Sequence, residues 1–459
     1  MGVQSRFIRL RAADLLNLAV ETKDSPANEG AVLILDGSRL PDGGQLSLRR
    51  LEALLSRVPQ LRRRIHRPGL FGGRPLWIDD PSFDIERHVD QVEVPPPGDE
   101  AALLALAGQL MVPLLDRSEP LWHVWFVTGL PHGRLAIVIK LHHVMADGLA
   151  ALQLLASLVS EDAAPPPAEM AAPTWRELVY DNLRARLGGL RQVNTMRLVA
   201  AAVRGTYLLL SESRNAPRTS LNAPVGPNRR LAVLRLDLAE VKRVAHAHGG
   251  KVNDVILALA TAGLRTLLIS RGEPVQGVRL HAGIAVSLRG KENPAEGGNR
   301  TGAYLVKLPV GESDPAARLL QIVAASVEAK GHQVNTAGNT MLMLLARLGL
   351  VRRFTRQQHF TNVMESNIAG PPDPISLLGA PVLDLIPVGN LAGNLALGFL
   401  ALSYGGHLNL TVQADADLYP DLPVLVDAMR QEWAALVDAR PDHPESGHER
   451  HRLGSRTCR

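Results

Sequence analysis

Cysteine is almost absent from this chain of 459 residues: the single one, Cys458, lies in a polar C-terminal tail. One thiol excludes a disulfide framework and any metal site built on several cysteines. It fits a reducing compartment, where disulfides are rare. Residues 1–24 also lack the continuous apolar core of a secretory signal, so we expect none.

Aromatic residues make up only 4% of the chain, although hydrophobic residues make up 46%. The core must therefore consist mostly of Leu, Val, Ala and Ile, and it is large enough for two or three domains. A membrane-spanning run is also missing. The best candidate, residues 381–404, is interrupted by Asp384, Pro387, Asn390 and Asn394, and we expect strands separated by turns there.

An excess of acidic charge is lacking as well, since the net charge is +5 and the pI is near 9.5. Nucleic acid is disfavoured as a partner because no recognition motif is present and aromatics are few. An anionic membrane surface or an anionic ligand such as coenzyme A fits equally well. The arginine-rich segment 175–210 predicts either a solvated helix pair or a membrane-facing amphipathic surface.

Short apolar runs alternate with helical patterns along the chain, which predicts an α/β architecture with mixed sheets. Strands are expected at 31–36, 121–130 and 134–143, and helices at 46–57, from Gly148 and at 250–270. The Pro-rich stretch 161–174 breaks the pattern. The predicted organisation is an N-terminal domain (1–160), a Pro-rich linker and basic helical connector (161–230), a C-terminal domain (231–440) and a disordered tail (441–459).

The stretch LHHVMADGL (141–149) places two histidines and an aspartate between two apolar segments. Adjacent strand side chains point to opposite faces, so His142 and His143 could not both ligate one ion without a bend. No HExxH spacing or cysteine pair supports a metal site, and we expect none. Two satisfied core histidines are the alternative. The motif nevertheless stands where a strand ends and a helix begins, and α/β proteins place reactive groups there.

Acid–base chemistry is the functional interpretation of this motif. A near-neutral imidazole can accept a proton from a hydroxyl as its oxygen attacks an acyl carbon. Only one ring can face the substrate, so we assign the base to His143 and a structural, hydrogen-bonded role to His142. Asp147 could orient the ring or turn away to pair with an arginine, and Gly148 permits an unusual backbone conformation. Because no GxSxG nucleophile motif is present, we expect direct transfer without an acyl-enzyme.

The motif resembles the HHxxxDG superfamily of coenzyme-A-dependent acyltransferases and peptide-synthetase condensation domains. Six further blocks, in order, are similar to bacterial wax ester synthase/diacylglycerol acyltransferases, and the resemblance runs from residue 8 to residue 437. The blocks are EPLWHVWFV (119–127), LNAPVGPNRRLAV (221–233), VNDVILA (252–258), AVSLRG (285–290), GNRTGAYLVKLP (298–309) and ESNIAGPPDPISLLGAP (365–381).

The resemblance implies two chloramphenicol-acetyltransferase-like domains with mixed sheets and an active-site tunnel between them. His143 would be the general base, and Asp147 would be structural, with Arg289 as its candidate partner. The second domain would line or support the site through Asn253, Asp254, Ser366 and Asn367. Trp122 belongs to the block that precedes the motif. Asx residues also favour helix N-termini, so a capping role for Asn253 and Asp254 stays open.

Two departures from the family pattern and one further position bear on the choice of substrate. The family usually has a Met-His pair before its first strand, whereas this chain has SPANEGAVLILDG (25–37). Ile368 and Ala369 stand where a valine and a proline are usual. Gly379 falls in a region that shapes the alcohol pocket of the family.

The leading hypothesis is an O-acyltransferase that moves a fatty acyl group from acyl-CoA, as substrate and without a cofactor, to a long-chain alcohol or a diacylglycerol. It would make wax esters or triacylglycerol in the cytoplasm, with a peripheral contact to the inner membrane face or lipid droplets. An enzyme of secondary metabolism that uses a carrier-protein donor or an amine acceptor is the second hypothesis. A lipid-binding protein with an inactive site is the third.

Overall fold

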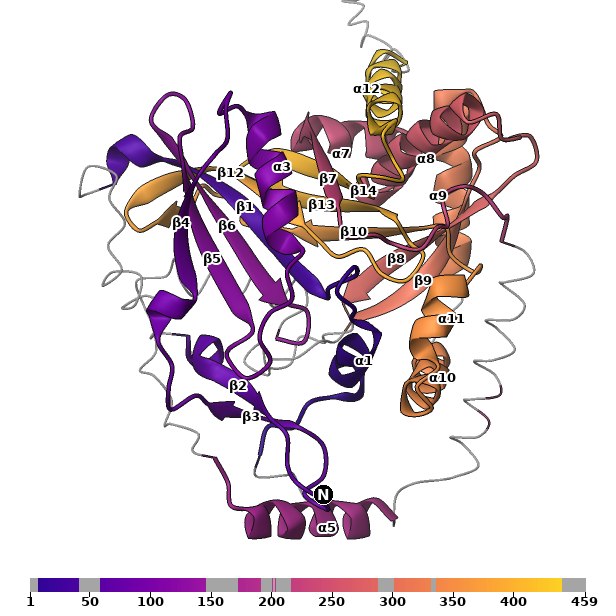
Figure 1. Cartoon of the computed structure of the whole chain (residues 1–459). Helices are drawn as coiled ribbons and strands as arrows, with labels where there is room; N and C mark the ends of the chain where they lie inside the picture. The colour runs from indigo at the N-terminus through magenta and orange to yellow at the C-terminus, as the bar shows by residue number, and fades with distance from the viewer. Residues whose placement is uncertain are drawn as a thin grey trace, which may run out of the picture.

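The computed structural model describes residues 7–40, 58–145, 172–190, 200, 203, 216–287, 301–331 and 336–439. Helices and strands alternate within these ranges, which confirms the predicted α/β class (Figure 1). The described strands form two six-stranded sheets and one two-stranded ribbon. Three predictions fall outside the described residues: the helix at 46–57, the helix from Gly148 and the tail at 441–459.

The first sheet has the strand order β11-β12-β1-β6-β5-β4. The β4–β5 pair is parallel and the other pairs are antiparallel, so the sheet is mixed as predicted. Its strands are β1 (Asn28–Asp36), β4 (Val89–Glu93), β5 (Trp122–Thr128), β6 (Arg134–His142), β11 (Ser376–Leu377) and β12 (Ala380–Val388). The strands predicted at 31–36, 121–130 and 134–143 correspond to β1, β5 and β6.

The central strands of this sheet are buried on both faces. In β1, Leu33 and Leu35 pack into one hydrophobic cluster, while Val32 and Ile34 pack into another that includes Leu103 of helix α3 (Glu100–Met111). Continuous apolar runs such as AVLIL are typical of strands covered on both sides. Helix α3 begins after Asp99, whose carboxylate accepts a hydrogen bond from the Ala102 N–H.

The second sheet has the order β7-β14-β13-β10-β8-β9 and is also mixed, because β10 pairs in parallel with both β8 and β13. Its strands are β7 (Arg229–Asp237), β8 (Leu280–Ser287), β9 (Thr301–Leu308), β10 (Val363–Ala369), β13 (Leu397–Tyr404) and β14 (His407–Asp415). The remaining helices and the ribbon are α1 (Ala12–Val20), α5 (Trp175–Leu190), α7 (Leu238–Ala247), α8 (Val252–Ser270), α9 (Pro315–Gly331), α10 (Thr336–Arg347), α11 (Val351–Gln357), α12 (Leu422–Asp438), β2 (Arg63–His66) and β3 (Leu76–Asp79).

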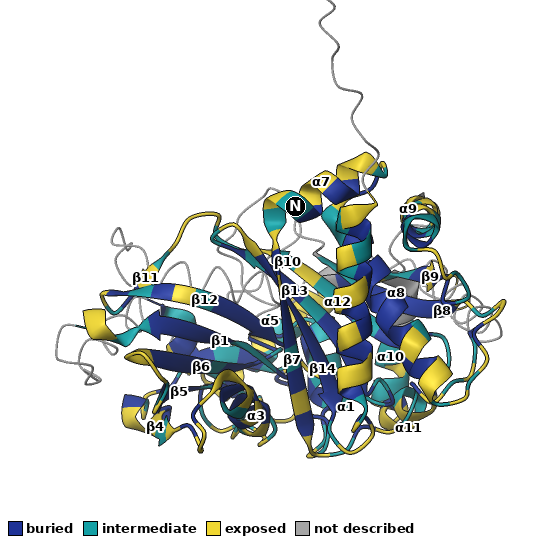
Figure 2. Cartoon of the chain, turned by 90° about the horizontal axis from the view of Figure 1, so that it is seen from above, coloured by how far each residue is buried: buried dark blue, intermediate teal, exposed yellow. Residues whose placement is uncertain are grey.

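Helix α8 is the central helix of the second half. It is apolar nearly all round and packs against α12, whose outer face is exposed (Figure 2). Among the described helices it alone is long and apolar enough to cross a membrane, yet 72% of its apolar window is buried inside the protein. Its composition is therefore explained by burial, and the sequence prediction of a helix at 250–270 is confirmed.

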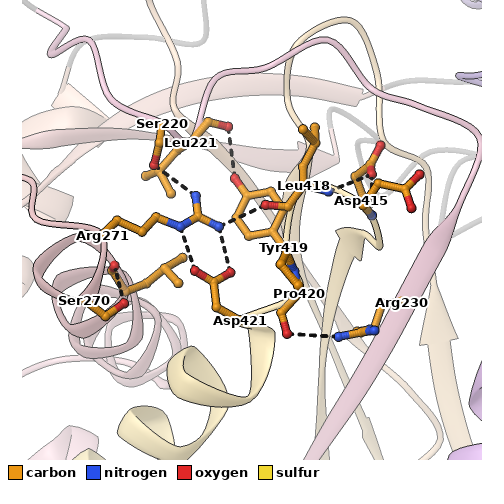
Figure 3. A network of polar contacts seen from close by, with 12 residues as sticks. Ser220, Leu221, Arg230, Ser270, Arg271, Asp415, Leu418, Tyr419, Pro420 and Asp421 are labelled. Carbon is orange, nitrogen blue, oxygen red and sulfur yellow. Dashed lines mark hydrogen bonds and ion pairs between the residues drawn. The ribbon is translucent and has the colours of Figure 1, made fainter.

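A clamp joins the end of α8 to the start of α12 (Figure 3). The Arg271 guanidinium donates two hydrogen bonds to the Asp421 carboxylate, at 2.8 and 2.7 Å, and lies 4.7 Å from the centre of the Tyr419 ring. The Tyr419 hydroxyl donates to the Leu221 carbonyl at 3.1 Å. This two-pronged geometry fixes the helix pair at one point.

Chain order and sheet membership do not coincide. Strands β11 and β12 come late in the chain but complete the first sheet, where β12 pairs along β1. Arg235 of β7 then reaches across to Asp384 of β12 and Glu100 of α3, at 2.7 Å each. The two halves are thus held together by an exchanged strand, and the predicted domain boundaries stay predictions.

Candidate active site

The histidine pair is positioned where β1 and β6 meet. His142 pairs with Asn28, and the His143 N–H donates to the Ala27 carbonyl at 2.7 Å. The Met145 N–H donates to the His142 carbonyl at 2.9 Å, which starts a turn directly after the strand. Consecutive side chains alternate between the faces of a sheet, so the two rings have different surroundings.

His142 is fully buried, with 0% of its side chain exposed. Its Nδ1 accepts a hydrogen bond from the Val144 N–H at 3.0 Å, and its Nε2 lies 3.2 Å from Oε1 of Glu21. An Nδ1 that accepts leaves the ring proton on Nε2, facing the carboxylate. Both nitrogens therefore face protein groups.

Glu21 comes from the loop between α1 and β1 and is almost fully buried. Burial raises the pKa of its carboxyl, but His142, Arg117 and the Ala27 N–H together outweigh this and lower the pKa to about 2. The Arg117 Nη2 donates to Glu21 Oε2 at 2.5 Å, and the Ala27 N–H donates to Oε1 at 3.1 Å. The ionised carboxylate holds His142 and the start of β1 together.

His143 keeps 21% of its side chain exposed, and its Nδ1 lies 3.4 Å from Oε2 of Glu29. The β1–β6 register pairs Glu29 with Leu141, which makes Glu29 and His143 diagonal neighbours on one face. Gly30 allows this approach, since a Cβ there would collide with the Ile139 carbonyl oxygen. A carboxylate beside Nδ1 and partial exposure are the features of an imidazole that can exchange protons.

A second polar group lies in the C-terminal half. The Asn367 amide of β10 donates to Asn253 Oδ1 of α8 at 3.2 Å, so the predicted ND block and Ser-Asn block do meet. Asp254 is buried and accepts from the Lys251 N–H at 2.8 Å, which is one half of a capping box. The capping interpretation of Asp254 and its place beside the Ser-Asn strand are therefore compatible.

Glu365 of β10 interacts with the Asn253 side chain of this group and is only 1% exposed. Burial raises the pKa of its carboxyl to about 8, with Asp254 adding to the rise and the Asn253 side chain opposing it. Burial, together with Glu365 and Asp254, also raises the pKa of Tyr304 to about 12. The carboxyl group of Glu365 is thus mostly neutral at pH 7, which removes the cost of burying a second charge next to Asp254.

The other predicted residues lie in the core, at a distant turn, on β10 or outside the described residues. Trp122 is 1% exposed, packs in the core, and donates from Nε1 to the Leu61 carbonyl at 2.6 Å. Gly379, with φ +89, forms the β11–β12 turn at the end of β1 opposite the histidines, roughly 25–30 Å away along the strand. Ser366 lies on β10 beside Asn367. Asp147, Gly148 and Arg289 fall outside the described residues.

Sequence reasoning missed the partners of the histidines: Glu21, Glu29 and Arg117. They lie far from the motif in sequence, and acidic or basic residues at such positions carry no local signal of a site. One indirect signal was present, because Glu29 belongs to the segment in which the chain departs from the family pattern. Among the described residues, no group of three His, Cys, Asp or Glu side chains could hold a metal ion.

Comparison with known proteins covers most of the chain. The model of the wax ester synthase/diacylglycerol acyltransferase catalytic domain matches residues 10–256, and that of the WS/DGAT C-terminal domain matches residues 297–436. A Mycobacterium tuberculosis protein named "Probable diacylglycerol O-acyltransferase tgs1" is 33% identical over 383 residues, 80% of this chain and 82% of its own length.

Solved structures agree with the family models. The wax ester synthase/diacylglycerol acyltransferase from Marinobacter aquaeolei VT8 is 25% identical, with a TM-score of 0.66 over 93% of this chain and 98% of its own. The first condensation domain of the calcium-dependent antibiotic synthetase, 16% identical with a TM-score of 0.64 over 95% of this chain and 98% of its own, shares the fold. The chain is therefore an acyltransferase that belongs to the wax ester synthase/diacylglycerol acyltransferase family.

Proposed function

We propose that this acyltransferase moves a fatty acyl group from acyl-CoA to a long-chain alcohol or a diacylglycerol, with His143 as general base. One observation carries the assignment of the base. His143 is partly exposed beside the Glu29 carboxylate, whereas both nitrogens of His142 face protein groups. Of the two imidazoles in the motif, His143 is the one that a substrate can reach.

The reaction needs one proton relay. The acceptor hydroxyl attacks the thioester carbonyl carbon, while Nε2 of His143 takes the hydroxyl proton. The attack forms the ester C–O bond, and collapse of the tetrahedral intermediate then restores the carbonyl and breaks the C–S bond. The same nitrogen then returns the proton to the leaving sulfur, which departs as the free thiol. General base catalysis of this kind contributes about 10²–10⁴-fold, and positioning the two substrates contributes roughly 7–11 kcal/mol.

Glu29 is proposed as the residue that positions this base. A carboxylate at Nδ1 favours the tautomer that carries its proton there, which leaves the lone pair on Nε2 for the acceptor. It also stabilises the imidazolium that forms when the hydroxyl proton is taken. Glu29 is 14% exposed, so the interaction is only partly screened by water.

The family and the net charge support this choice of donor and acceptor. The net charge of +5 fits a donor that carries the phosphates of coenzyme A, and no separate cofactor is proposed. We place the protein in the cytoplasm, at the surface of a membrane or lipid droplet, where long-chain acceptors are found.

The test of the base is the purified variant His143→Ala. Thiol release from palmitoyl-CoA with hexadecanol is expected to fall at least about 10²-fold, while the unfolding transition stays cooperative. The companion variant His142→Asn tests whether His142 stabilises the fold or takes part in the reaction. It should lower the free energy of unfolding, because a buried ring with two partners is lost. A folded His143→Ala protein with wild-type turnover would contradict the proposal.

The choice of substrates is tested separately. The same acyl group is offered as free acyl-CoA and as an acyl-carrier-protein thioester, and faster turnover with acyl-CoA is expected. Mass spectrometry of neutral lipids from a host without wax esters or triacylglycerol then identifies the acceptor. A strict requirement for the carrier protein, or an amide product, would favour an enzyme of secondary metabolism.

A further inference from the structure

Helix α5 lies along one end of the molecule, beyond the ribbon of β2 and β3 (Figure 1). Its inner face is fixed to the protein. Leu178 is buried in a cluster with Leu76 and Ile78 of β3. The Arg9 guanidinium pairs with Asp181 at 2.8 Å, and these side chains are 9% and 13% exposed. The position of the helix is therefore set by both packing and a shielded ion pair.

The outer face of α5 is apolar. Tyr180, Leu183 and Leu187 are 68%, 54% and 57% exposed. At about 100° per residue, Leu183 and Leu187 lie roughly 140° and 180° round the helix from the buried Leu178. A helix that buries one apolar stripe against its protein normally exposes polar residues on the opposite side. Here the side facing away from the protein carries a second apolar stripe.

The loop between β2 and β3 extends this stripe. Leu70 and Phe71 are 77% and 68% exposed, among the most exposed large hydrophobic side chains described. Two hydrogen bonds hold the loop against α5: the Trp175 Nε1–H donates to the Leu70 carbonyl at 3.0 Å, and the Asn182 amide donates to the Phe71 carbonyl at 2.8 Å. Phe71 has φ +66, a strained conformation for a bulky residue, and its ring still points out of the core.

Basic side chains surround the apolar residues. The exposed arginines of the loop and helix are Arg67, Arg74, Arg176, Arg184 and Arg186. The acidic charge nearby is smaller, because Asp181 is turned inward to Arg9 and only Glu177 is an exposed acid on the described part of α5. Apolar side chains rimmed by arginines match an anionic lipid surface, in which acyl chains lie beneath negative headgroups.

We propose that this face, defined as Leu70, Phe71, Trp175, Tyr180, Leu183 and Leu187 with the five arginines, docks the enzyme on an anionic phospholipid bilayer. The purpose of the contact rests on the proposed function, since a lipid acceptor reaches the enzyme from such a surface. The binding itself depends on apolar insertion and headgroup attraction, and needs no turnover.

The experiment is vesicle flotation of the full-length protein, with phosphatidylcholine vesicles that contain about 30% phosphatidylglycerol or none. The apolar variant Tyr180→Ser/Leu183→Ser/Leu187→Ser should lower the partition coefficient at least about tenfold. Phe71→Gly should lower it as well without strain, because glycine accepts the positive φ. Raising the salt from about 0.1 M to about 1 M should weaken binding, since the Debye length falls from roughly 10 to 3 Å.

The matched control removes three exposed apolar side chains elsewhere: Leu320→Ser/Val327→Ser/Leu348→Ser, at sites that are 52%, 70% and 61% exposed. Its partition coefficient should equal that of the wild type. His143→Ala should bind vesicles normally, so loss of chemistry and loss of docking are distinguished. Equal binding of wild type and apolar variant, or equal binding to vesicles without phosphatidylglycerol, would overturn the proposal. So would a wild type that ignores vesicles and forms a dimer that the apolar variant abolishes.

Discussion

Two adjacent histidines have opposite environments because the β1–β6 pairing sends consecutive side chains to opposite faces. One segment, residues 21–29, supplies a carboxylate to each ring. Glu21 lies at Nε2 of His142, and Glu29 lies at Nδ1 of His143. The fully enclosed ring contacts protein groups at the strand end, and the partly exposed ring is the one that we propose for the proton relay.

Glu29→Gln tests the positioning of His143. The amide keeps the shape of the side chain, but its NH₂ group can donate to Nδ1 and so favour the wrong tautomer. We expect kcat to fall on the order of tenfold with little change in KM for the acyl donor, since the loss concerns the transition state. Steady-state kinetics with purified enzyme measures both constants.

Glu29→Asp is the matched control, because it keeps the charge and should restore part of kcat. The ¹⁵N spectrum of labelled histidine rings, assigned by comparison with His143→Ala, should show a changed tautomer in Glu29→Gln alone. Unchanged kcat and unchanged ring signals in that variant would show that Glu29 has no positioning role.

At this scale the sequence identified the motif but not its surroundings. His142 and His143 could be assigned different roles because strand alternation is a local rule. The carboxylates could not be found, because the pairing of residues 28–36 with 134–142 is a tertiary event. Trp122 was singled out by its block, yet burial in the core explains its environment.

Among the elements, the close pairing of β1 with β6 depends on Gly30. A Cβ at residue 30 would strike the Ile139 carbonyl oxygen, so Gly30→Ala must push β1 away from β6. We expect the free energy of unfolding to fall by at least about 2 kcal/mol, and activity to fall further because Glu29 moves with the backbone. Urea unfolding and turnover measure the two effects.

Gly398→Ala in β13 provides the comparison, since a Cβ there would meet its nearest neighbours at ordinary contact distance, 3.7 Å. Its effect on unfolding should stay within about 1 kcal/mol. Equal losses in the two variants would mean that the close approach at Gly30 is not what constrains the pair of strands.

The clamp between α8 and α12 supplies a second prediction for the elements. Arg271→Lys keeps the positive charge but loses the two-pronged bond to Asp421 and the stacking on Tyr419. We expect a loss of about 1–2 kcal/mol in the free energy of unfolding. The control Arg430→Lys alters an exposed pair between Arg430 and Asp427, both on α12. It should lower the free energy of unfolding by less than about 0.5 kcal/mol. Comparable losses of unfolding free energy in the two variants would argue against the importance of the paired hydrogen bonds from Arg271 to Asp421.

The strand predicted from the apolar run at 134–143 was confirmed because local pattern and tertiary burial agree there. The sheet to which a strand belongs is not a local property. Residues 380–388 read as a strand from their sequence, but nothing in them indicates that they pair with β1 instead of a neighbour from the C-terminal half. That pairing also explains why Gly379 lies far along the sheet from the histidines.

In the molecule as a whole, the segment that carries Glu21 and Glu29 is also a junction between the two halves. The Ser25 hydroxyl donates to the Leu391 carbonyl at 2.7 Å, and Arg229 donates to the Asp24 carbonyl at 2.8 Å. The histidine site is therefore built from the first sheet but braced by the second half. Resemblance to a family predicted the two-part architecture, whereas these bracing contacts could be found only in the structure.

The stability of the whole molecule should depend on pH because two buried carboxyl groups, Glu21 and Glu365, have pKa values shifted in opposite directions. Glu21 has its pKa lowered to about 2, so its contribution is present above its ordinary pKa of 4.5 and is lost as the pH falls through 2. Glu365 has its pKa raised to about 8, so its contribution is complete below 4.5 and is lost as the pH rises through 8.

Glu365→Gln removes the second of these dependences, because the amide stays neutral at every pH. In the wild type, the folded protein keeps Glu365 protonated while the unfolded chain ionises it. Between the unfolded pKa of 4.5 and the folded pKa of about 8, this lowers the free energy of unfolding by roughly 1.4 kcal/mol per pH unit. The variant should therefore gain about 2–3 kcal/mol relative to the wild type between pH 6 and pH 8. Urea unfolding at both pH values measures the gain, with the exposed Glu86→Gln as control. A difference between variant and wild type that stays constant with pH would mean that Glu365 is ionised in the folded protein, balanced by a charge that Asn253 and Asp254 do not provide.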